Sequence, residues 1–487
     1  MSTNNRDLAR LPRGFRDRPA ADVLAERQML DRIRSVFESY GFDALETPAF
    51  EFADALGKFL PDQDRPNEGV FALRDDDEQW LSLRYDLTAP LARYVAQNYD
   101  VLPKPFRRYQ TGSVYRNEKP GPGRFREFTQ FDADTVGTAS MLADAEGAML
   151  LCDAFDALGL GGQYVVKMNN RKILNGVLET AGVRDDAQRM TVLRAIDKLD
   201  RLGAAGVRLL LGAGRKDESG DFTKGAGLSP DAIEKVLAFT ASGAALRSDV
   251  CGRFDALVGD SADGAQGVKE LREIDAFLTA AGYESTRVAF DPAIVRGLAY
   301  YTGPVLEAEM TFEVRNEDGQ LVRFGSVASG GRYDDLVKRF TGQDVPATGV
   351  SIGVSRLLAA LSARGLTAQD VFDGPVVVLV MDRDAIPGYL AMVRELRAAG
   401  IRAEVYMGTS GMKAQMKYAD KRQSRVAVIE GGDERARGEV TLKDLALGAE
   451  QAKQVKDRDQ WAKGGSAQVT IPRSELVARV KAMLGRA

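Results

Sequence analysis

The 487-residue chain contains no histidine at all. Imidazole is the side chain that most readily moves protons near neutral pH and that most often ligates metals. Its absence excludes His-based acid–base catalysis, Ser–His and Cys–His nucleophile pairs, and imidazole metal sites. Any chemistry must therefore rely on arginines, carboxylates, a bound hard cation and the substrates themselves.

Cysteine and long apolar runs are also scarce. Cys152 and Cys251 are the only two cysteines, too few for a disulfide scaffold or a cysteine-built zinc site. Residues 376–381 form one of the longest apolar runs, which is far shorter than a membrane span. The polar start, MSTNNRDLAR, lacks the apolar core of a secretory signal. We therefore expect a reducing, cytoplasmic location and no membrane partner.

What is present is the composition of a folded protein, 44% hydrophobic and 28% charged. The length exceeds one ordinary core, so we expect two to four domains. The net charge of −4 is uneven: from Pro375 onward there are 20 Lys and Arg against 14 Asp and Glu, which leaves −10 for the rest. A basic end on an acidic body indicates a polyanionic partner, although a solvated surface gives the same count.

Apolar periodicity and turn residues predict the order of the elements. Before residue 171 the pattern predicts helices at 21–40, 88–98 and 139–158, and strands at 42–51, 70–75, 80–87 and 163–170. Residues 171–281 favour helices separated by glycines. Strand patterns return at 287–292, 304–316 and 321–331, followed by a helix that starts near Ser351 and carries Arg356.

The pattern changes at Gly374-Pro375, where short apolar strands begin to alternate with helices at 386–399 and 412–421. That alternation is typical of a small α/β domain with a partly parallel sheet. We expect an α+β protein: a mostly antiparallel sheet flanked by helices in two parts, 1–170 and 282–372, a mainly helical insertion, 171–281, and the α/β domain, 373–487. The main boundary is expected near Phe372.

Residues 115–134, YRNEKPGPGRFREFTQFDAD, are the most informative segment. Gly121-Pro122-Gly123 suits a tight turn, and a strand of alternating charged and apolar residues follows it. Period-two geometry places six side chains on one face of that strand: Arg124, Arg126, Phe128, Gln130, Asp132 and Asp134. The face spans roughly 20 Å from Arg124 to Gln130. It could hold a nucleotide at its cationic end and a small polar molecule at the other, or it could be a solvated hairpin.

The chain has neither a GxxxxGK[ST] loop nor a convincing GxGxxG loop between a strand and a helix. A bound nucleotide would therefore have its phosphates held by side chains, for which Arg116, Arg124 and Arg356 are candidates. Glu118 and Asp132 could help to hold Mg²⁺, which prefers oxygen ligands.

Two further segments carry groups suited to a small polar ligand. Residues 296–303, RGLAYYTG, combine an arginine with paired tyrosines beside glycine, although an edge strand with aromatic packing gives the same pattern. In residues 83–90, LRYDLTAP, a carboxylate at Asp86 and a hydroxyl at Thr88 could bind an ammonium group. Asp86 could equally be a helix N-terminal residue.

Together these segments resemble the histidyl-tRNA synthetase family of class II aminoacyl-tRNA synthetases. LPRGFRD with the following helix and ETPAFE resembles the first class-defining motif, which forms the dimer interface. LRYDLTAP resembles the amino-acid-binding strand, and residues 106–134 resemble the second motif. RGLAYYTG resembles the histidine-specific signature, and ASGGRYDDL with GVSIGVSRL resembles the third motif. The likeness runs from about residue 11 to the end.

The resemblance implies a histidine–tRNA ligase that uses ATP with Mg²⁺, acts on L-histidine and tRNA(His), works as a homodimer and ends in an anticodon-binding domain. It assigns ATP to Arg116, Glu118, Arg124 and Arg356. It assigns histidine to Asp86, Thr88, Gln130, Asp134, Arg296, Tyr300 and Tyr301. Arg296 would bridge the histidine carboxylate and the α-phosphate, so that Arg296 and Arg116 carry catalysis through electrostatic stabilisation without a protein base.

Two departures from the family pattern stand out. Ala299 occupies a position where the signature usually has Asp, so a polar contact in the pocket is missing or supplied elsewhere. Asn117 and Gly121 stand where the second motif usually has His and Gln, in the loop that approaches the acceptor end of the tRNA. A divergent recognition of that end is a hypothesis.

The main rival is a non-catalytic paralogue of the same fold, the regulatory subunit of ATP phosphoribosyltransferase. That protein typically lacks the basic C-terminal domain, and its sequence no longer keeps the signature and the ATP-binding arginines. This chain keeps Arg116, Arg124, Arg296 and Arg356. A synthetase for threonine or proline and a nucleic-acid-binding module with an inactive body are further alternatives.

Overall fold

The computed structural model describes residues 9–56, 69–119, 125–216, 220–295, 301–315, 321–366, 374–447 and 467–485. The chain divides into two compact units, Met1–Thr367 and Ala368–Ala487, which are considered one at a time. The expected boundary at Phe372 lies outside the described residues.

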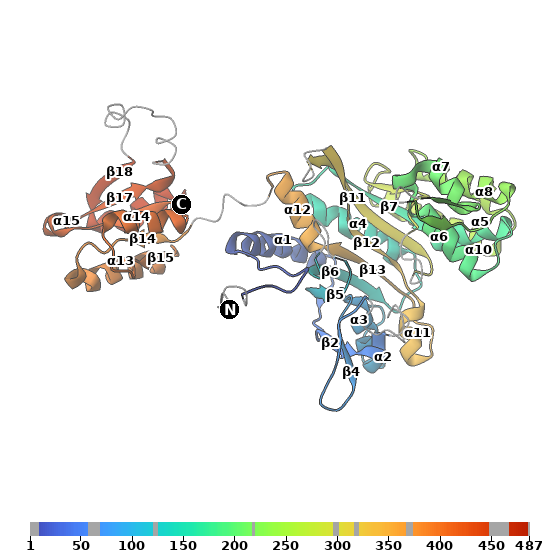
Figure 1. The fold of residues 1–487 in the computed structure, drawn as a ribbon, viewed down its shortest axis with the longest axis horizontal. Helices are drawn as coiled ribbons and strands as arrows, with labels where there is room; N and C mark the ends of the chain where they lie inside the picture. The colour runs from blue at the N-terminus through green and yellow to red at the C-terminus, as the bar shows by residue number, and fades with distance from the viewer. Residues whose placement is uncertain are drawn as a thin grey trace. The chain divides into compact units, whose positions relative to one another are not determined.

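The first unit is built on an eight-stranded, mostly antiparallel sheet (Figure 1). Its centre is the antiparallel run from β5 to β7, and short parallel strands, β1 and β10, lie at its two edges. In spatial order the strands are β1 (Asp43–Ala44), β5 (Phe106–Tyr115), β6 (Glu127–Val136), β13 (Ala347–Gly353), β12 (Leu321–Arg332), β11 (Pro304–Arg315), β7 (Tyr164–Asn170) and β10 (Val288–Phe290).

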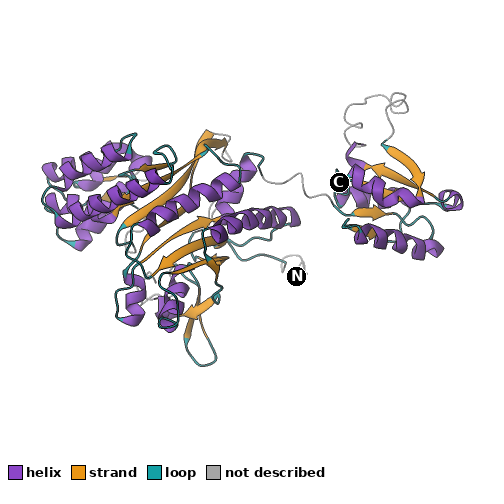
Figure 2. Cartoon of the chain, turned by 180° about the vertical axis from the view of Figure 1, so that it is seen from behind, coloured by secondary structure: helices purple, strands orange, loops and turns teal. Residues whose placement is uncertain are grey.

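Three helices cover one face of this sheet: α1 (Ala20–Ser39), α4 (Leu142–Ala157) and α12 (Val354–Ala363). Figure 2 shows them lying across the strands. Ile33 and Phe37 of α1 meet Phe131 and Ala133 of β6 in one buried cluster. Because Phe131 and Ala133 alternate with polar residues, the opposite face of β6 is left for side chains that do not belong to the core.

A smaller sheet of three strands precedes β5 in the chain. Its order is β2 (Phe50–Phe52), β4 (Trp80–Leu83), β3 (Ala72–Arg74), all antiparallel. The short helix α2 (Ala53–Leu56) follows β2. Helix α3 (Thr88–Gln97) follows β4 and packs with α11 (Asp335–Thr341) over a second apolar cluster.

The described residues of 171–280 form six helices and one short hairpin, grouped at the end of the sheet that carries β7 and β10 (Figure 1). Polar side chains start four of the helices, as expected for N-caps: Asn170, Asp185, Ser229 and Ser261 each accept a backbone N–H. The elements are α5 (Arg171–Thr180), α6 (Asp186–Ile196), α7 (Leu199–Leu211), β8 (Gly214–Lys216), β9 (Phe222–Lys224), α8 (Pro230–Thr240), α9 (Arg247–Val258) and α10 (Ala262–Ala280).

The second unit is a five-stranded α/β sheet in the order β15-β14-β16-β17-β18, parallel in its first three strands. All three residues of β14 are buried, which explains its continuous apolar sequence. The strands are β14 (Val376–Val378), β15 (Ala403–Val405), β16 (Val426–Ile429), β17 (Glu439–Asp444) and β18 (Gln468–Pro472). The helices are η4 (Arg383–Ala385), α13 (Ile386–Ala398), α14 (Met412–Lys421), α15 (Gly432–Arg437), η5 (Arg473–Glu475) and α18 (Leu476–Met483).

Most expected elements are confirmed, and three are wrong in detail. The strand expected at 80–87 ends at Leu83, and residues 84–87 form the connection to α3. Residues 42–51 were expected as one strand, but they supply β1 and β2, which belong to different sheets; Pro48 cannot donate to a ladder and lies between them. The helix expected from Ser351 begins at Val354, because Ser351 still pairs with Asp132 and Ser329 inside β13. None of the helices in the described part of the chain combines the length and apolar character needed to cross a membrane.

Helices α5 and α10 cross at a pair of glycines, which generates a stability prediction. A Cβ at Gly176 would lie 2.6 Å from the Cα of Gly264, so Gly176→Ala should force the helices apart and cost about 1–3 kcal/mol. Gly252 of α9 is a matched control, since nothing lies within 4 Å of its added Cβ. Gly252→Ala should be neutral or stabilising by up to about 1 kcal/mol. Thermal unfolding of both variants decides the matter; equal melting temperatures would contradict the close crossing.

Candidate active site

The ladder between β5 and β6 gives the polar face of β6 its neighbours. Across this ladder Arg108 pairs with Asp134, Gln110 with Asp132, and Gly112 with Gln130. Directly opposed residues share a face, so the three pairs lie on the side away from α1 and α4. The period-two prediction for Phe128, Gln130, Asp132 and Asp134 is therefore confirmed.

Strand β13 flanks this row on its other side with small residues. Gly349, Ser351 and Gly353 pair with Asp134, Asp132 and Gln130. A Cβ on Gly349 would clash with Oδ1 of Asp134, so glycine is required there for a close approach. The small residues of β13 thus let the side chains of Gln130, Asp132 and Asp134, called the acidic row below, pack close against this strand.

Gln130 and Asp132 are buried, with exposed fractions of 8% and 2%, yet they keep unused hydrogen-bonding capacity. Nε2 of Gln130 donates to Oγ of Ser351 at 2.5 Å. Oε1 of Gln130 and Oδ1 of Asp132 have no hydrogen-bond partner within the described residues. Buried acceptors without partners are costly, and they are satisfied if a ligand brings donors such as an ammonium group.

Asp134 is 3% exposed and is held from two sides. Tyr333 donates its hydroxyl hydrogen to Oδ1, and Nη2 of Arg108 lies 2.9 Å from Oδ2. Burial raises the pKa of Asp134, and the Arg108 charge and the Tyr333 hydrogen bond oppose that rise. Burial and the neighbouring Asp134 together raise the pKa of Asp132 to about 7.

Asp86 and Thr88 lie in the turn between β4 and α3. Oδ1 of Asp86 accepts the backbone N–H groups of Thr88, at 3.1 Å, and Ala89, at 2.9 Å. Asp86 thus starts helix α3, one of its two expected roles. Burial is the largest cause of the raised pKa values of Asp132 and Asp134, and the negative charge of Asp86 raises both further.

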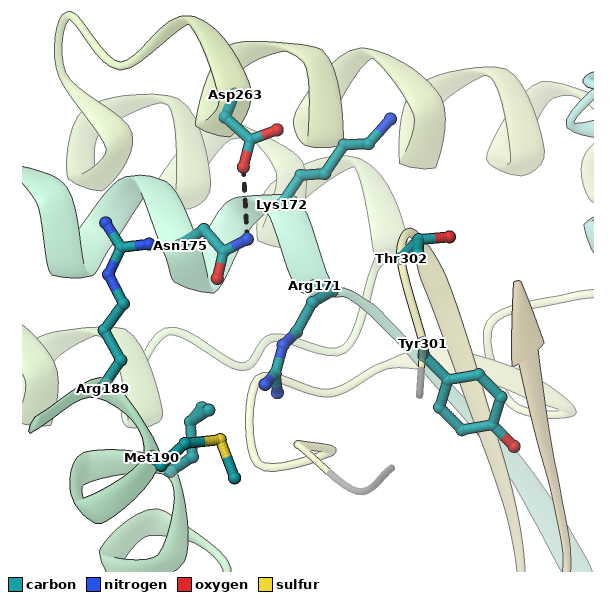
Figure 3. Close-up of a pocket in the computed structure, with 9 residues that line it drawn as sticks. Arg171, Lys172, Asn175, Arg189, Met190, Asp263, Tyr301 and Thr302 are labelled. Atoms are coloured by element: carbon teal, nitrogen blue, oxygen red, sulfur yellow. Dashed lines mark hydrogen bonds between the residues drawn. The ribbon is translucent and has the colours of Figure 1, made fainter. Parts of the chain in front are cut away.

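Tyr301 approaches the same acidic row from the start of β11. Burial raises the pKa of its hydroxyl, and the charges of Asp132, Asp134 and Asp86 raise it further. Its ring packs over Gly331, where an added Cβ would lie 2.9 Å from the ring. Tyr301 and Thr302 also border a cavity of about 380 Å³, whose opposite wall is formed by residues of α5, α6 and α10 (Figure 3). Tyr301 therefore borders this cavity and also carries a hydroxyl that is influenced by the charges of the acidic row.

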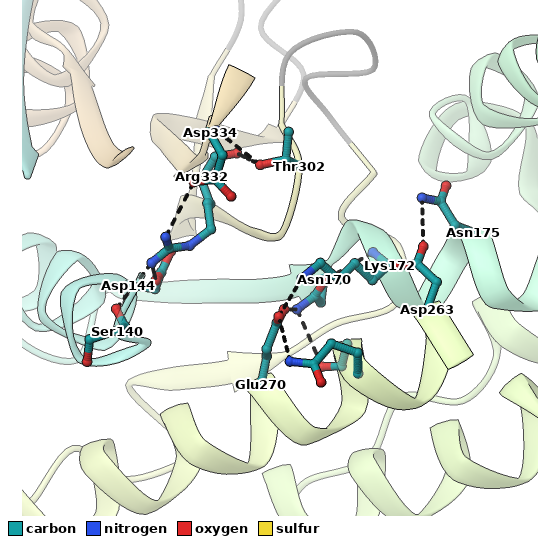
Figure 4. A network of polar contacts seen from close by, with 12 residues as sticks. Ser140, Asp144, Asn170, Lys172, Asn175, Asp263, Glu270, Thr302, Arg332 and Asp334 are labelled. Carbon is teal, nitrogen blue, oxygen red and sulfur yellow. Dashed lines mark hydrogen bonds and ion pairs between the residues drawn. The ribbon is translucent and has the colours of Figure 1, made fainter. Parts of the chain in front are cut away.

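A buried polar network anchors the residue after Tyr301 (Figure 4). The N–H of Thr302 donates to the carbonyl oxygen of Arg332 at 2.8 Å, and its hydroxyl accepts from the N–H of Asp334 at 3.2 Å. The Arg332 side chain forms an ion pair with Asp144 and donates to Thr138 O and Ser140 O. These contacts fix the position from which Tyr301 reaches the site.

At the other end of the β5–β6 ladder, Arg116 lies between two aromatic rings. The Arg116 guanidinium lies 4.3 Å from the ring centroid of Tyr85 and 5.0 Å from that of Phe128. The hydroxyl of Tyr85 donates to Oε1 of Glu118 at 3.0 Å. Tyr85 therefore holds Arg116 and Glu118 beside each other, with the planar cation pre-oriented for a phosphate or a ring.

Arg356 lies on α12 with an exposed side chain, and its Nη2 donates to Phe324 O at 3.1 Å. Arg124, Arg296 and Tyr300 lie outside the described residues, as does the departure at Ala299. Of the expected site residues, the structure thus brings Asp86, Gln130, Asp134 and Tyr301 together at one end. It brings Arg116 and Glu118 together at the other.

Sequence reasoning missed several neighbours that hold these residues in place. They are Arg84, whose guanidinium donates to Ser113 O and Thr47 O beneath Gly112, and Tyr85, Arg108, Tyr333 and Ser351. Arg84 and Tyr85 belong to the same LRYDLTAP motif as Asp86, and this closeness in sequence could have marked them as site neighbours. Arg108 and Gln110 are two residues apart on β5 and so share a face, and β6, the strand that pairs with β5, was predicted.

Comparisons with known proteins identify the family of the chain. A family model described as histidyl-tRNA synthetase matches residues 14–357, and one described as an anticodon binding domain matches residues 375–483. The chain is 58% identical to the histidine–tRNA ligase of Brucella ovis over 484 residues, which covers 98% of this chain and 96% of that protein.

Solved structures give the same picture. The crystal structure of histidyl-tRNA synthetase from Nostoc sp. PCC 7120 superposes with a TM-score of 0.72 at 31% identity, over 97% of this chain and 99% of that one. A Bacillus halodurans structure, titled ATP phosphoribosyltransferase regulatory subunit/histidyl-tRNA synthetase, gives 0.66 at 22% identity over 84% of this chain and 96% of that one, and indicates the fold alone.

The chain has a class II aminoacyl-tRNA synthetase fold. It combines an antiparallel sheet, covered by helices on one face and polar on the other, with a C-terminal anticodon-binding domain. The chain belongs to the histidyl-tRNA synthetase family.

The raised pKa of Asp132 generates a prediction about stability. Between the unfolded value near 4 and the folded value of about 7, the folded state holds the proton and the unfolded state does not. Stability linked to Asp132 is therefore lost as pH rises through that window. Asp132→Asn cannot ionise, so it should melt several degrees above the parent at pH 8, with the difference shrinking towards pH 4.

Melting temperatures across this pH range provide the measurement. Asp260→Asn, at an exposed carboxylate, is the control and should change stability by less than about 0.5 kcal/mol. A difference between parent and Asp132→Asn that does not vary with pH would show that burial of the ionised carboxylate is not the cause.

Proposed function

We propose that the chain is a histidine–tRNA ligase. It activates histidine with ATP to form histidyl-adenylate and pyrophosphate, and then transfers histidine to the 3′ end of tRNA(His). The identity of 58% to a curated histidine–tRNA ligase over nearly the whole chain carries this proposal. The buried row of unsatisfied acceptors on β6 supports it, because a small cationic substrate would satisfy them.

The substrate histidine would bind at the acidic end of β6. Gln130, with Oε1 unused inside the described residues, would accept a hydrogen bond from the ammonium group, together with Thr88 and the Asp86 oxygen that does not cap α3. Asp134, fixed by Arg108 and Tyr333, would accept from the imidazole. Tyr301 and Tyr300 would line the ring pocket.

ATP would bind at the cationic end. Arg116, held between Tyr85 and Phe128, would contact the α-phosphate, and Glu118 would lie beside it. Arg124 and Arg356 would hold the bent triphosphate and the adenine. Guanidinium groups suit this task because they stay charged and donate to phosphate oxygens in pairs.

Activation would proceed by attack of the histidine carboxylate oxygen on the α-phosphorus, with pyrophosphate leaving. Arg296 would bridge both reacting groups, and Arg116 would stabilise the charge that builds on the phosphate. No protein base is needed, since the carboxylate is already ionised. In the second step the terminal ribose hydroxyl attacks the carbonyl carbon, and AMP leaves.

Magnesium would come with ATP and take most of its ligands from phosphates and water. Glu118 fits that role because its carboxylate is exposed beside Arg116. Asp132, the other expected ligand, is buried next to Asp134 and fits a hydrated cation poorly. In the described part of the chain, no group of three or more Asp, Glu or Cys is placed to hold a metal alone.

The regulatory-paralogue alternative is not favoured. A C-terminal anticodon-binding domain is matched over residues 375–483, and the 58% identity is to a protein named as the ligase. The basic excess after Pro375 fits tRNA as the partner of that domain. We also propose a location in the cytoplasm, where tRNA(His) would be charged for translation.

A homodimer is proposed from the small sheet β2-β4-β3. Phe50, Phe52 and Leu73 share one face with Leu81 and Leu83 through the cross-strand pairs. The first three are 45%, 53% and 45% exposed, although their positions would suit a core. Contiguous exposed apolar side chains of this kind mark interfaces, and a second copy of the chain is the proposed occupant.

Arg116→Ala tests the assignment of ATP. Histidine-dependent ATP–pyrophosphate exchange should occur in the parent protein and fall about 100-fold in kcat/KM for ATP in the variant, because a preoriented cation at the α-phosphate is lost. Arg107→Ala is the control: Arg107 lies on the same strand region but pairs with Glu146, so kcat/KM for ATP should stay within twofold. A parent protein that exchanges pyrophosphate without added histidine would refute the proposed function.

Phe52→Glu combined with Leu73→Glu tests the homodimer. Two buried charges at the interface should convert a parent dimer into monomers at micromolar concentration, as measured by sedimentation velocity. Phe222→Glu changes a 60% exposed phenylalanine of β9 in the same way and should leave the dimer intact. A monomeric parent protein would contradict the proposal.

A further inference from the structure

Arg108 is a fully buried arginine at the centre of the site, with an exposed fraction of 0%. It lies on β5 directly across from Asp134, and Nη2 lies 2.9 Å from Oδ2 of that residue. The same nitrogen donates its hydrogen bond to the carbonyl oxygen of Leu87, also at 2.9 Å. The contact with Asp134 is therefore an ion pair, while the directed hydrogen bond goes to the Leu87 turn.

Those two contacts link separate substrate-facing elements. Asp134 lies near the end of β6, whereas Leu87 stands between Asp86 and Thr88 in the turn before α3. One guanidinium group thus fixes the distance between the Asp134 carboxylate and the Asp86 turn. Within the described residues, the Arg108 side chain thus joins Asp134 to the Asp86 turn, the two parts of the proposed histidine site.

The electrostatic surroundings show what Arg108 opposes. Tyr333 donates a hydrogen bond to Asp134, and Asp132 on the same strand, Asp86 in the α3 turn and Tyr301 are the ionisable groups coupled to it by charge. Burial and the nearby carboxylates favour the protonated form of Asp134, and Arg108 is the cation that opposes them. Without it, Asp134 would hold its proton to higher pH and would lack the negative charge that attracts the N–H of the substrate.

Stability alone does not account for this arginine. Nε and Nη1 of Arg108 are buried without hydrogen-bond partners in the described part of the chain, and each unsatisfied donor costs on the order of 1–3 kcal/mol. A buried ion pair can often be replaced by apolar side chains without loss of stability. Its retention next to the substrate face therefore points to a functional role.

We infer that Arg108 is a positioning residue for histidine recognition, which acts by holding the Asp134 carboxylate and the Asp86 turn in the arrangement that binds the substrate. This inference rests on the proposed function, since it needs histidine to occupy the acidic end of β6. It does not give Arg108 any contact with the substrate or with ATP.

Arg108→Met removes the charge at nearly constant volume and is the main test. In histidine-dependent ATP–pyrophosphate exchange, KM for histidine should rise about tenfold or more while KM for ATP stays within twofold. The acidic limb of kcat/KM for histidine should also move about one unit or more to higher pH, because Asp134 loses the cation that keeps it ionised. Titration of the substrate imidazole affects parent and variant equally and cancels in the comparison.

Two further variants separate positioning from a loss of folding. Arg108→Lys keeps a cation and should leave the acidic limb near its parent position even if KM rises. Arg247→Met removes another buried arginine, 3% exposed and paired with Asp275 between α9 and α10, and should lower the melting temperature without changing KM for histidine. Equal KM effects in Arg108→Met and Arg247→Met would overturn the inference.

A double-mutant cycle shows whether Arg108 acts through Asp134. Asp134→Asn should already raise KM for histidine, and adding Arg108→Met should raise it further by clearly less than the tenfold expected in the parent, because only the contact with Leu87 is then left to lose. Independent, multiplicative effects would refute a role through Asp134. If the parent protein lacks histidine-dependent exchange, the proposed function fails; if exchange is present and Arg108→Met keeps its KM and pH profile, the positioning inference alone fails.

Discussion

The register of β6 against β5 and β13 is the constraint on which the site depends. Alternate residues of this strand have opposite tasks: Phe131 and Ala133 complete the core beneath α1 and α4, while Gln130, Asp132 and Asp134 face away from it. A slip of one residue would bury three polar side chains in the core and expose the apolar ones. Because the large core enforces the register, the acidic row is positioned by packing that takes no part in chemistry.

The same arrangement explains why so many polar atoms remain unsatisfied in a well-packed domain. Gln130 and Asp132 are both nearly inaccessible, yet each keeps an acceptor unused within the described residues. Such atoms lower stability in the absence of a ligand and add to affinity when a ligand satisfies them. Burial of the two neighbouring carboxylates also lowers stability when they are ionised, and it raises the pKa values of both Asp132 and Asp134. These groups therefore lower the stability of the free protein, and a bound cationic substrate would offset that loss.

The sequence was sufficient for the main elements and for the faces of β6, but not for the contacts between strands. A tight turn at residues 121–123 predicts that the strands on its two sides pair, but it does not fix which residues lie opposite each other, such as Arg108 and Asp134. The sandwich of Arg116 between Tyr85 and Phe128 depends on two segments 31 or more positions apart, and local periodicity carries no information on it.

Errors in the sequence reading had the same origin. Residues 42–51 have strand character throughout, and only the separation of two sheets at Pro48 divides them. Helix α12 begins later than its apolar pattern suggests because pairing of β13 with β6 and β12 competes for Ser351, and the strand wins. That competition has a chemical result: Ser351 stays in the ladder, where its hydroxyl accepts the hydrogen bond of Gln130. Tertiary pairing thus determined both a helix boundary and the orientation of an amide in the site, and neither follows from local propensity.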